Sequence, residues 1–207
     1  MCGRYVITSP VSKSSNLVKK SINVKDVDNY NAHPQQLLPV IKKYINGNTL
    51  ENKKWGIVPS WAKSKDFKPL INARLETINE KISFKKLIKT KRCIAIADGF
   101  YEWKRDQKEK MPFYFYRSDK KNIYFAAIYN EDQFCLITEK ASSKILSIHH
   151  RQPVILYEKD ISNYLNLEFD GSNFLKDCNK PNLDFHEISK NVNKPTNNDV
   201  SLIEKIN

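Results

Sequence analysis

The amino-acid sequence predicts an α+β fold in a single domain, with a mainly antiparallel, mixed or barrel-like β-sheet flanked by short helices. The chain has 207 residues, enough to bury a sizeable core in one domain. The predicted strands outnumber the predicted helices, and the two do not alternate in the order of a parallel sheet. No internal repeat, heptad pattern or low-complexity segment divides the sequence.

Apolar runs bounded by turn residues predict strands along the whole chain. Residues 5–8 form the first strand, and the proline-containing segment 30–40 is an extended loop followed by a strand. The next strand covers residues 49–58 and ends at Pro59. The remaining predicted strands are residues 93–97, 113–117, 123–129, 134–138 and 154–157.

Helices are predicted where apolar residues recur at the spacing of one helix face. In residues 80–91, Phe84, Leu87 and Ile88 lie on one face and lysines on the other. Shorter helices are predicted for residues 16–22 and 161–167. From residue 190 onward Asn, Pro and Lys are prominent, so we expect a mostly extended segment anchored by Leu202 and Ile203.

The charge balance favours a polyanionic partner. Lys plus Arg number 35 and Asp plus Glu 23, which gives a formal net charge of +12 and an isoelectric point near 9.4. Such a basic domain is typical of nucleic-acid binding, although a lysine-rich proteome gives the same composition. Aromatic residues make up 11% of the chain, and exposed aromatic rings stack on bases.

The cysteines indicate a reducing compartment. Cys2, Cys93, Cys135 and Cys178 form no C-x-x-C pair, so we expect neither disulfides nor a metal site, and no cofactor. Cys93 and Cys135 lie in apolar runs and are predicted to be buried. The sequence lacks a signal peptide and a membrane span, so we expect a protein that is not secreted and contacts no membrane. We also expect a monomer. Its expected location is cytoplasmic in a bacterium, or nuclear in a eukaryote.

Cys2 combines two reactive groups once Met1 is removed. Its free α-amine and its thiol then lie on adjacent carbons, with ordinary pKa values of about 7.7–8.0 and about 8.5. The amine can condense with an aldehyde, and the thiol can then close a five-membered ring on the same carbon. The alternative is that Cys2 is a small residue at a frayed terminus.

Four polar segments follow or precede apolar runs and carry the remaining reactive groups. Together they supply a thiol, an amide, a carboxylate, an imidazole and three guanidinium groups. The segments are residues 2–5, 70–77, 97–103 and 148–154.

In combination these segments resemble the SOS-response-associated peptidase (SRAP) proteins, also called abasic-site processing proteins. The resemblance runs from Cys2 to about Asn198, which predicts a domain at 2–198 and a C-terminal tail at 199–207. Gln152 departs from the family pattern, which has Met there. The matching motifs are Cys-Gly-Arg-Tyr at 2–5, Tyr-Asn-x-x-Pro at 30–34, Trp-Gly-x-x-Pro-Ser-Trp-Ala at 55–62, Asn-Ala-Arg-x-Glu-Thr at 72–77, Asp-Gly-Phe-Tyr-Glu-Trp at 98–103 and His-x-Arg-x-Pro at 149–153.

The resemblance implies covalent capture of abasic sites in single-stranded DNA through Cys2. It gives Asn72 the role of orienting the Cys2 amine, Glu102 that of the acid/base carboxylate, and His149 that of assisting sugar-ring opening. The chemistry agrees, because an imidazole exchanges protons near neutrality and a partly buried carboxyl has a raised pKa. The neighbouring His150 is the competing assignment. Structural alternatives are a hydrogen-bonded histidine, a surface carboxylate and a turn-capping asparagine.

Five further residues are predicted to bind DNA. The resemblance implies that Arg4 and Arg74 hold phosphates, and the same role is assigned to Arg151. A surface ion pair such as Arg74 with Glu76 is the alternative. Trp55 and Trp61 are predicted to stack on bases, with core packing as the alternative. The densest basic run, Lys85 to Arg92, is interpreted as a solvated helix face that also attracts phosphates.

The leading functional hypothesis is an abasic-site sensor that forms a thiazolidine crosslink with single-stranded DNA and shields the lesion. Weak lyase activity at abasic sites is a secondary expectation, because an imine intermediate permits β-elimination. One alternative is an N-terminal-nucleophile cysteine peptidase, which includes self-removal of Met1, although no oxyanion-hole signature is evident. Another is a non-catalytic single-stranded DNA-binding protein.

Overall fold

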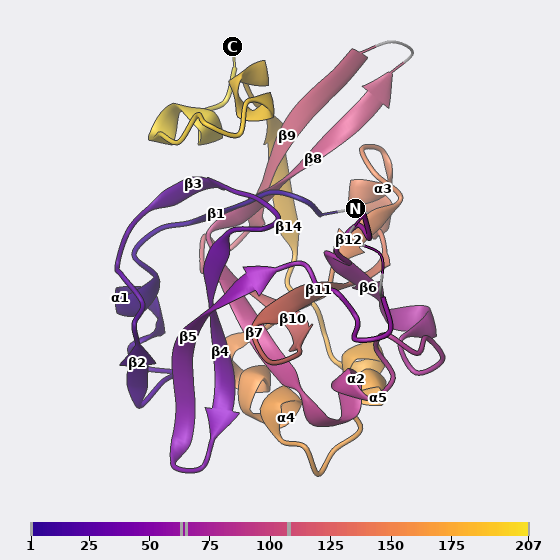
Figure 1. The fold of residues 1–207 in the computed structure, drawn as a ribbon. Coiled ribbons are helices and arrows are strands. Elements are labelled where there is room, and N and C mark those ends of the chain that lie inside the picture. Colours follow the sequence, from indigo (N-terminus) through magenta and orange to yellow (C-terminus); the bar gives the residue numbers. More distant parts are fainter. Residues whose placement is uncertain (1, 63, 65, 107–108, 207) are drawn as a thin grey trace.

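Two β-sheets form the body of the protein (Figure 1). The computed structural model describes residues 2–62, 64, 66–106 and 109–206. Within these residues, the smaller sheet has five strands in the order β14-β9-β8-β1-β3, with every neighbouring pair antiparallel. Its strands are β1 (Tyr5–Ile7), β3 (Asn29–Ala32), β8 (Gly99–Asp106), β9 (Glu109–Arg117) and β14 (Leu183–Glu187).

The larger sheet is mixed and closes on itself. Its path within the described residues is β12-β11-β10-β7-β4-β5-β2, and β5 also pairs in parallel with β11. Five of these strands therefore form a closed barrel, while β6 and β13 pair with β11 and β10. The strands are β2 (Lys20–Ile22), β4 (Leu37–Tyr44), β5 (Gly47–Trp55), β6 (Asn72–Arg74), β7 (Arg92–Ala97), β10 (Ile123–Tyr129), β11 (Gln133–Lys140), β12 (Arg151–Pro153) and β13 (Ile155–Leu156).

Short helices surround the sheets, so the predicted α+β class with a barrel-like sheet is confirmed (Figure 1). In chain order, the α-helices are α1 (Pro10–Ser14), α2 (Leu87–Thr90), α3 (Ser143–Leu146), α4 (Ile161–Leu165) and α5 (Gly171–Asp177). The 3₁₀ helices are η1 (Leu75–Thr77), η2 (Glu158–Asp160), η3 (Lys190–Asn193) and η4 (Val200–Ile203).

Two helix predictions are wrong. The first helix is α1, which Pro10 begins, and part of the predicted helix 16–22 is instead β2, paired with β5. The predicted helix 80–91 contains only the four residues of α2, preceded by turns. Phe84 and Ile88 are nevertheless buried, because the turns keep them on one face. Ile82 and Ser83 are weak helix formers, which is consistent with the interruption.

The C-terminal segment folds back onto the smaller sheet. It was predicted to be extended, but it forms η3 and η4, whose preceding residues Ser189 and Asp199 cap them with their side chains. Leu202 is fully buried, as predicted for an anchor, in a cluster with Val6 and Tyr101. Residues beyond 198 therefore pack on the body of the protein.

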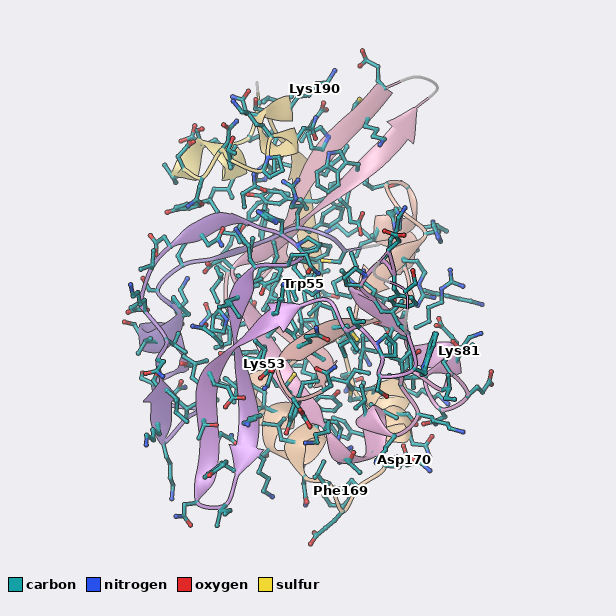
Figure 2. The ribbon with its side chains drawn as sticks, in the orientation of Figure 1. Lys53, Trp55, Lys81, Phe169, Asp170 and Lys190 are labelled. Carbon is teal, nitrogen blue, oxygen red and sulfur yellow. The ribbon has the colours of Figure 1, made fainter. Side chains whose placement is uncertain are left out.

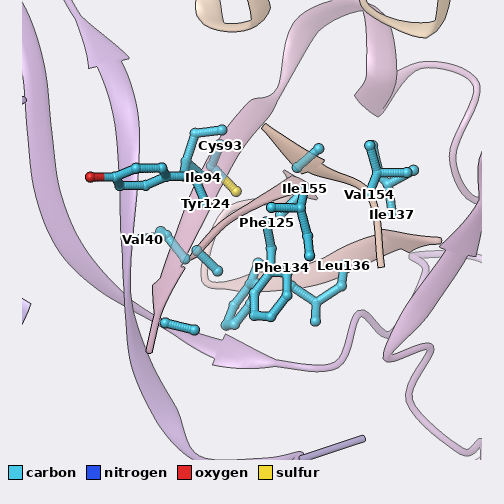
Figure 3. Close-up of a cluster of buried hydrophobic side chains, with 14 of the residues drawn as sticks. Val40, Cys93, Ile94, Tyr124, Phe125, Phe134, Leu136, Ile137, Val154 and Ile155 are labelled. Carbon is cyan, nitrogen blue, oxygen red and sulfur yellow. The ribbon is translucent and has the colours of Figure 1, made fainter. Parts of the chain in front are cut away.

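The main core lies inside the barrel and between the two sheets. Cys93, Phe125 and Phe134 are fully buried there (Figure 3), and Cys135 is too. Trp55 lies in the interior, whereas Lys81 and Lys190 lie at the periphery (Figure 2). Burying one large apolar side chain contributes about 1.5–3 kcal/mol, so this cluster fixes the frame that carries the polar segments.

Candidate active site

Cys2 lies three residues before the start of β1, a strand paired on both sides. β1 pairs with β3 and β8, and the amide of Tyr101 on β8 donates to the carbonyl of Arg4. The Cys2 side chain is fully buried, with its Sγ 3.9 Å from the carbonyl oxygen of Arg4. The thiol is thus held inside the protein, and the alternative of a frayed terminus does not describe Cys2.

Asn72 contacts Cys2 directly. It begins β6, and its Nδ2 donates to the carbonyl oxygen of Cys2 at 2.8 Å. Its Oδ1 is buried and has no hydrogen-bond partner among the described residues. A buried amide oxygen in this state is an acceptor held ready for a donor.

Glu102 reaches the site from β8. Side chains two apart on a strand share a face, so Phe100 and Glu102 both point to the main core, while Tyr101 packs in the smaller cluster. Glu102 is 3% exposed, and burial raises the pKa of its carboxyl above the ordinary value. Its Oε1 lies 3.9 Å from Nδ1 of His149.

His149 is held by the strand that follows it. The amide of Arg151 donates to His149 Nδ1 at 3.1 Å, and the carbonyl oxygen of Arg151 lies 3.0 Å from the same nitrogen. The exposed His150 packs against it, with ring centroids 4.5 Å apart. Desolvation, and next the neighbouring His149, lower the pKa of His150. Of the two histidines, His149 has its Nδ1 within 3.9 Å of the Glu102 carboxyl, and the charge of His150 also acts on that carboxyl.

The thiol of Cys2 is not pre-ionised. Burial raises its pKa far above the ordinary value, and the nearby carboxylate of Glu102 raises it further. The protonated thiol is therefore the resting form. The site contains two contacts, one between Cys2 and Asn72 and one between Glu102 and His149. The charge of Glu102 acts on Cys2, so the two contacts lie in one region. The four residues predicted to be catalytic are thus brought together by the segment before β1, by β6 and β8, and by the turn before β12.

The predicted DNA-binding residues differ in how far they are exposed: Arg74 and Trp61 are exposed, Arg4 is partly buried, and Trp55 and Arg151 are buried. Arg74 on β6 is exposed, and Trp61 is 50% exposed with its ring against Phe67. Arg4 is partly buried, and its Nη1 donates to Asn31 Oδ1 at 2.6 Å and to the Val192 carbonyl at 2.9 Å. Burial lowers the pKa of Arg4.

Two of the predicted DNA-binding residues are buried. Trp55 is fully buried, packs against Tyr5 and Phe134, and donates from Nε1 to the Ile71 carbonyl, so it has no exposed face for a base. Arg151 is 6% exposed, and its guanidinium is bound to Glu76 and to the Thr138 carbonyl. Core packing, the stated alternative, therefore describes Trp55, and an ion pair occupies Arg151; whether either residue contacts DNA stays a prediction.

Three polar residues support the site without having been singled out. Asn31 is 1% exposed and joins Arg4 to carbonyls of the C-terminal segment. Glu76 and Thr138 bind Arg151. Asn31 and Glu76 lie within the motifs at 30–34 and 72–77, and these motifs were the signal by which both could have been found. For Glu76 the expected partner was Arg74, whereas its observed partner is Arg151. No group of His, Cys, Asp and Glu within the described residues is arranged to hold a metal ion.

Comparisons with known proteins agree with one another. The model of the SOS response associated peptidase (SRAP) family matches residues 1–195. The chain is 33% identical to abasic site processing protein YoqW of Bacillus subtilis, over 99% of each chain, and 28% identical to abasic site processing protein YedK of Escherichia coli, over 100% of each. A crystal structure of a protein from Bacteroides thetaiotaomicron has the same fold, with a TM-score of 0.83 at 23% identity, covering 99% of this chain and 100% of that one. Within the described residues, no helix is long and apolar enough to cross a membrane.

Proposed function

The chain belongs to the SOS response associated peptidase (SRAP) family, and from this premise we propose that it processes abasic sites in DNA. Its proposed reaction is capture of the abasic aldehyde in single-stranded DNA by Cys2, giving a thiazolidine crosslink that shields the lesion. The relatives named as abasic site processing proteins support the substrate. Removal of Met1 by hydrolysis precedes the reaction, since an acylated nitrogen cannot condense with an aldehyde.

The reaction joins two reactants with loss of one water. The Cys2 amine adds to the aldehyde carbon, and the resulting carbinolamine loses its hydroxyl as water to give an imine. The sulfur then adds to the imine carbon, and the imine nitrogen accepts a proton as the thiol loses one. No oxidant or reductant is needed, and holding both nucleophiles on one residue makes ring closure intramolecular.

The neighbouring side chains match these proton transfers. The Asn72 side chain already donates to the Cys2 carbonyl, and its Oδ1, which lacks a hydrogen-bond partner among the described residues, can accept from the Cys2 amine without adding charge. A carboxyl whose pKa is raised, as at Glu102, holds its proton to higher pH and can donate it to the departing hydroxyl. His149 can move a proton between the ring oxygen and the anomeric hydroxyl, which opens the sugar. Proton transfer of this kind typically contributes about 10²–10⁴-fold.

The observation that carries the proposal is the contact of Asn72 Nδ2 with the Cys2 carbonyl at 2.8 Å, beside the Glu102–His149 pair. It supports a site built around the first residue of the processed chain. Exposed Arg74 and Trp61 are the proposed contacts for the phosphates and bases of a single strand.

The test is a crosslinking assay with processed protein and single-stranded DNA that contains one abasic site. We expect a heat-stable adduct whose intact mass equals protein plus DNA minus one water. Cys2→Ser should lose the stable adduct, because an oxygen-containing ring hydrolyses more readily, and Cys178→Ser should retain it. A stable adduct with Cys2→Ser would contradict the thiazolidine. Borohydride trapping of the imine tests the proposed weak lyase step.

The peptidase alternative has less support. Cysteine peptidases depend on a thiolate whose pKa is lowered, whereas burial and Glu102 raise the pKa of the Cys2 thiol. Peptide turnover that is lost in Cys2→Ala and unaffected by abasic DNA would favour it. Unchanged DNA binding by Cys2→Ala, with no adduct from the unsubstituted protein, would favour a non-catalytic DNA-binding protein.

A further inference from the structure

We propose that the hydroxyl of Tyr5 is a catalytic group that donates a hydrogen bond to the Cys2 sulfur while the thiazolidine ring closes. This inference rests on the proposed function, because it concerns one step of that reaction. It starts from a fully buried hydroxyl that the packing of the protein does not use.

The Tyr5 side chain is fixed by its ring, not by its oxygen. It is fully buried, and its ring packs against Trp55 and Phe125, with centroids 5.1 and 5.7 Å away. Its hydroxyl has no hydrogen-bond partner among the described residues. A buried hydroxyl in this state makes the folded protein less stable than a phenylalanine of the same shape would. The hydroxyl therefore has a donor to offer to a group that forms during the reaction.

Tyr5 and Cys2 share one environment. Along β1 the side chains alternate, so Tyr5 and Ile7 point into the main core while Val6 packs in the smaller cluster. The fully buried Cys2 side chain belongs to the same main core. Burial raises the pKa of the Tyr5 phenol well above its ordinary value, and the charge of Cys2 raises it further, more than that of Cys93 does. The Tyr5 hydroxyl thus keeps its proton and faces the Cys2 sulfur as a donor.

Ring closure gives the Cys2 sulfur a need for such a donor. The sulfur donates an electron pair to the imine carbon, and the thiol proton passes to the imine nitrogen. Burial opposes negative charge on this sulfur, since it raises the pKa of the thiol far above the ordinary value. The present partner of Sγ is the Arg4 carbonyl oxygen at 3.9 Å, an acceptor that cannot stabilise negative charge. A hydrogen bond from Tyr5 can, and its O–H bond stays intact throughout.

The other groups around Cys2 suit this step less well. The carboxyl of Glu102 is acidic, and its charge raises the pKa of the thiol further. The Nδ2 of Asn72 donates to the Cys2 carbonyl oxygen at 2.8 Å and so holds the backbone of Cys2. Tyr5 therefore complements these two residues, which act on the amine and on the departing hydroxyl in the proposed reaction.

Tyr164 provides a matched control for the substitution Tyr5→Phe. It is also fully buried, but it lies in α4, outside the four polar segments of the site. Its hydroxyl donates to the Ala127 carbonyl oxygen at 2.8 Å. Tyr164→Phe thus removes a hydroxyl that has a partner, whereas Tyr5→Phe removes one that has none among the described residues.

The experiment follows imine formation and ring closure separately in the unsubstituted protein, Tyr5→Phe and Tyr164→Phe. Processed protein is mixed with single-stranded abasic DNA and sampled over time. Borohydride reduces the imine to a stable amine, and the heat-stable adduct formed without borohydride reports the closed ring. Affinity is measured with a tetrahydrofuran abasic analogue, which has no aldehyde, and stability by urea unfolding. Adduct formation by the unsubstituted protein tests the proposed function separately.

For Tyr5→Phe we expect ring closure to slow by about 10–10²-fold, the effect of losing one hydrogen bond to a charged group. The borohydride-trapped imine should accumulate, while its rate of formation and the DNA affinity stay within about twofold of the unsubstituted values. Tyr5→Phe should unfold at the same or a higher urea concentration. Tyr164→Phe should keep both rates and unfold at a lower urea concentration, because the Ala127 carbonyl loses its donor.

Two results would overturn the proposal. One is ring closure by Tyr5→Phe within about threefold of the unsubstituted rate, with no accumulation of imine. The other is a loss of stability in Tyr5→Phe equal to that in Tyr164→Phe, which would show that the Tyr5 hydroxyl is bonded within the folded protein. The stability comparison needs no DNA, so it tests the premise of the proposal independently of the proposed function.

Discussion

The carboxyl of Glu102 is placed where its charged form is unfavourable. It is 3% exposed, and burial raises its pKa. A group of this kind favours the folded state when protonated and opposes it when ionised. The same property suits the general-acid role proposed for Glu102, which would then be gained at a cost in stability.

Substituting Glu102 with Gln should therefore stabilise the protein in a pH-dependent way. Below the ordinary carboxyl pKa both folded and unfolded chains are protonated, so the two proteins should differ little. As pH rises above that value the unfolded chain ionises first, and the unsubstituted protein loses stability until the folded pKa is passed. Urea unfolding at pH 4 and pH 8 measures this difference.

We expect Glu102→Gln to have the higher free energy of unfolding at pH 8, together with slower adduct formation. Glu109→Gln, on an exposed side chain, is the control and should change neither quantity. A larger gain at pH 4 than at pH 8 would contradict the burial argument.

For single residues, the sequence predicted which side chains are reactive better than it predicted which side chains are buried. The four polar segments were identifiable because reactive groups at the ends of apolar runs stand out, and the family resemblance then singled out Cys2, Asn72, Glu102 and His149 within them. The burial of Trp55 and Arg151 could not be predicted in the same way, because exposure depends on strands that are distant in sequence. Asn31 lies in a recognisable motif, but its role depends on the C-terminal carbonyls that it contacts.

Among the elements, β1 and the C-terminal segment act together. Asn31 Nδ2 donates to the carbonyls of Val192, Lys194 and Asn197, and Arg4 donates to that of Val192. The C-terminal segment thus covers the outer face of the strand that presents Cys2. Its 3₁₀ turns could not be predicted from periodicity, because short turns depend on single capping residues.

Leu202→Ala tests how far this segment stabilises the protein. The side chain is fully buried with Val6 and Tyr101, so its loss should lower the free energy of unfolding by about 2–5 kcal/mol. Chemical denaturation measures this loss, and Val200→Ala, on a 53% exposed side chain, is the control. Equal effects of the two substitutions would contradict the described packing.

For the molecule as a whole, the positive charge is spread over many side chains. The net charge is +12, and Lys85, Lys86 and Lys89 lie at the surface near α2, as predicted for the basic run. Arg92, which ends that run, is instead 3% exposed and donates to the carbonyls of Asn166 and Phe169. The exposed positive charge of this region is therefore carried by its lysines.

Affinity for single-stranded DNA should fall steeply with salt. For each phosphate contact we expect a loss of about 2.6-fold between about 50 and about 200 mM salt. Arg74→Gln should make the dependence shallower by about one contact, whereas Lys159→Gln, beside α4, should leave the slope unchanged. Fluorescence anisotropy over a salt series measures both slopes, and equal slopes would contradict the role of Arg74.

The complete enclosure of the Cys2 sulfur also bears on how long the protein stays usable. Under the proposed function the crosslink consumes Cys2, so the protein would act once and its thiol would have to stay unmodified until a lesion is met. Peroxides and alkylating agents attack ionised, accessible sulfur fastest, and this sulfur is neither. Burial of the Cys2 sulfur is therefore expected to slow its oxidation and alkylation under the conditions that damage DNA.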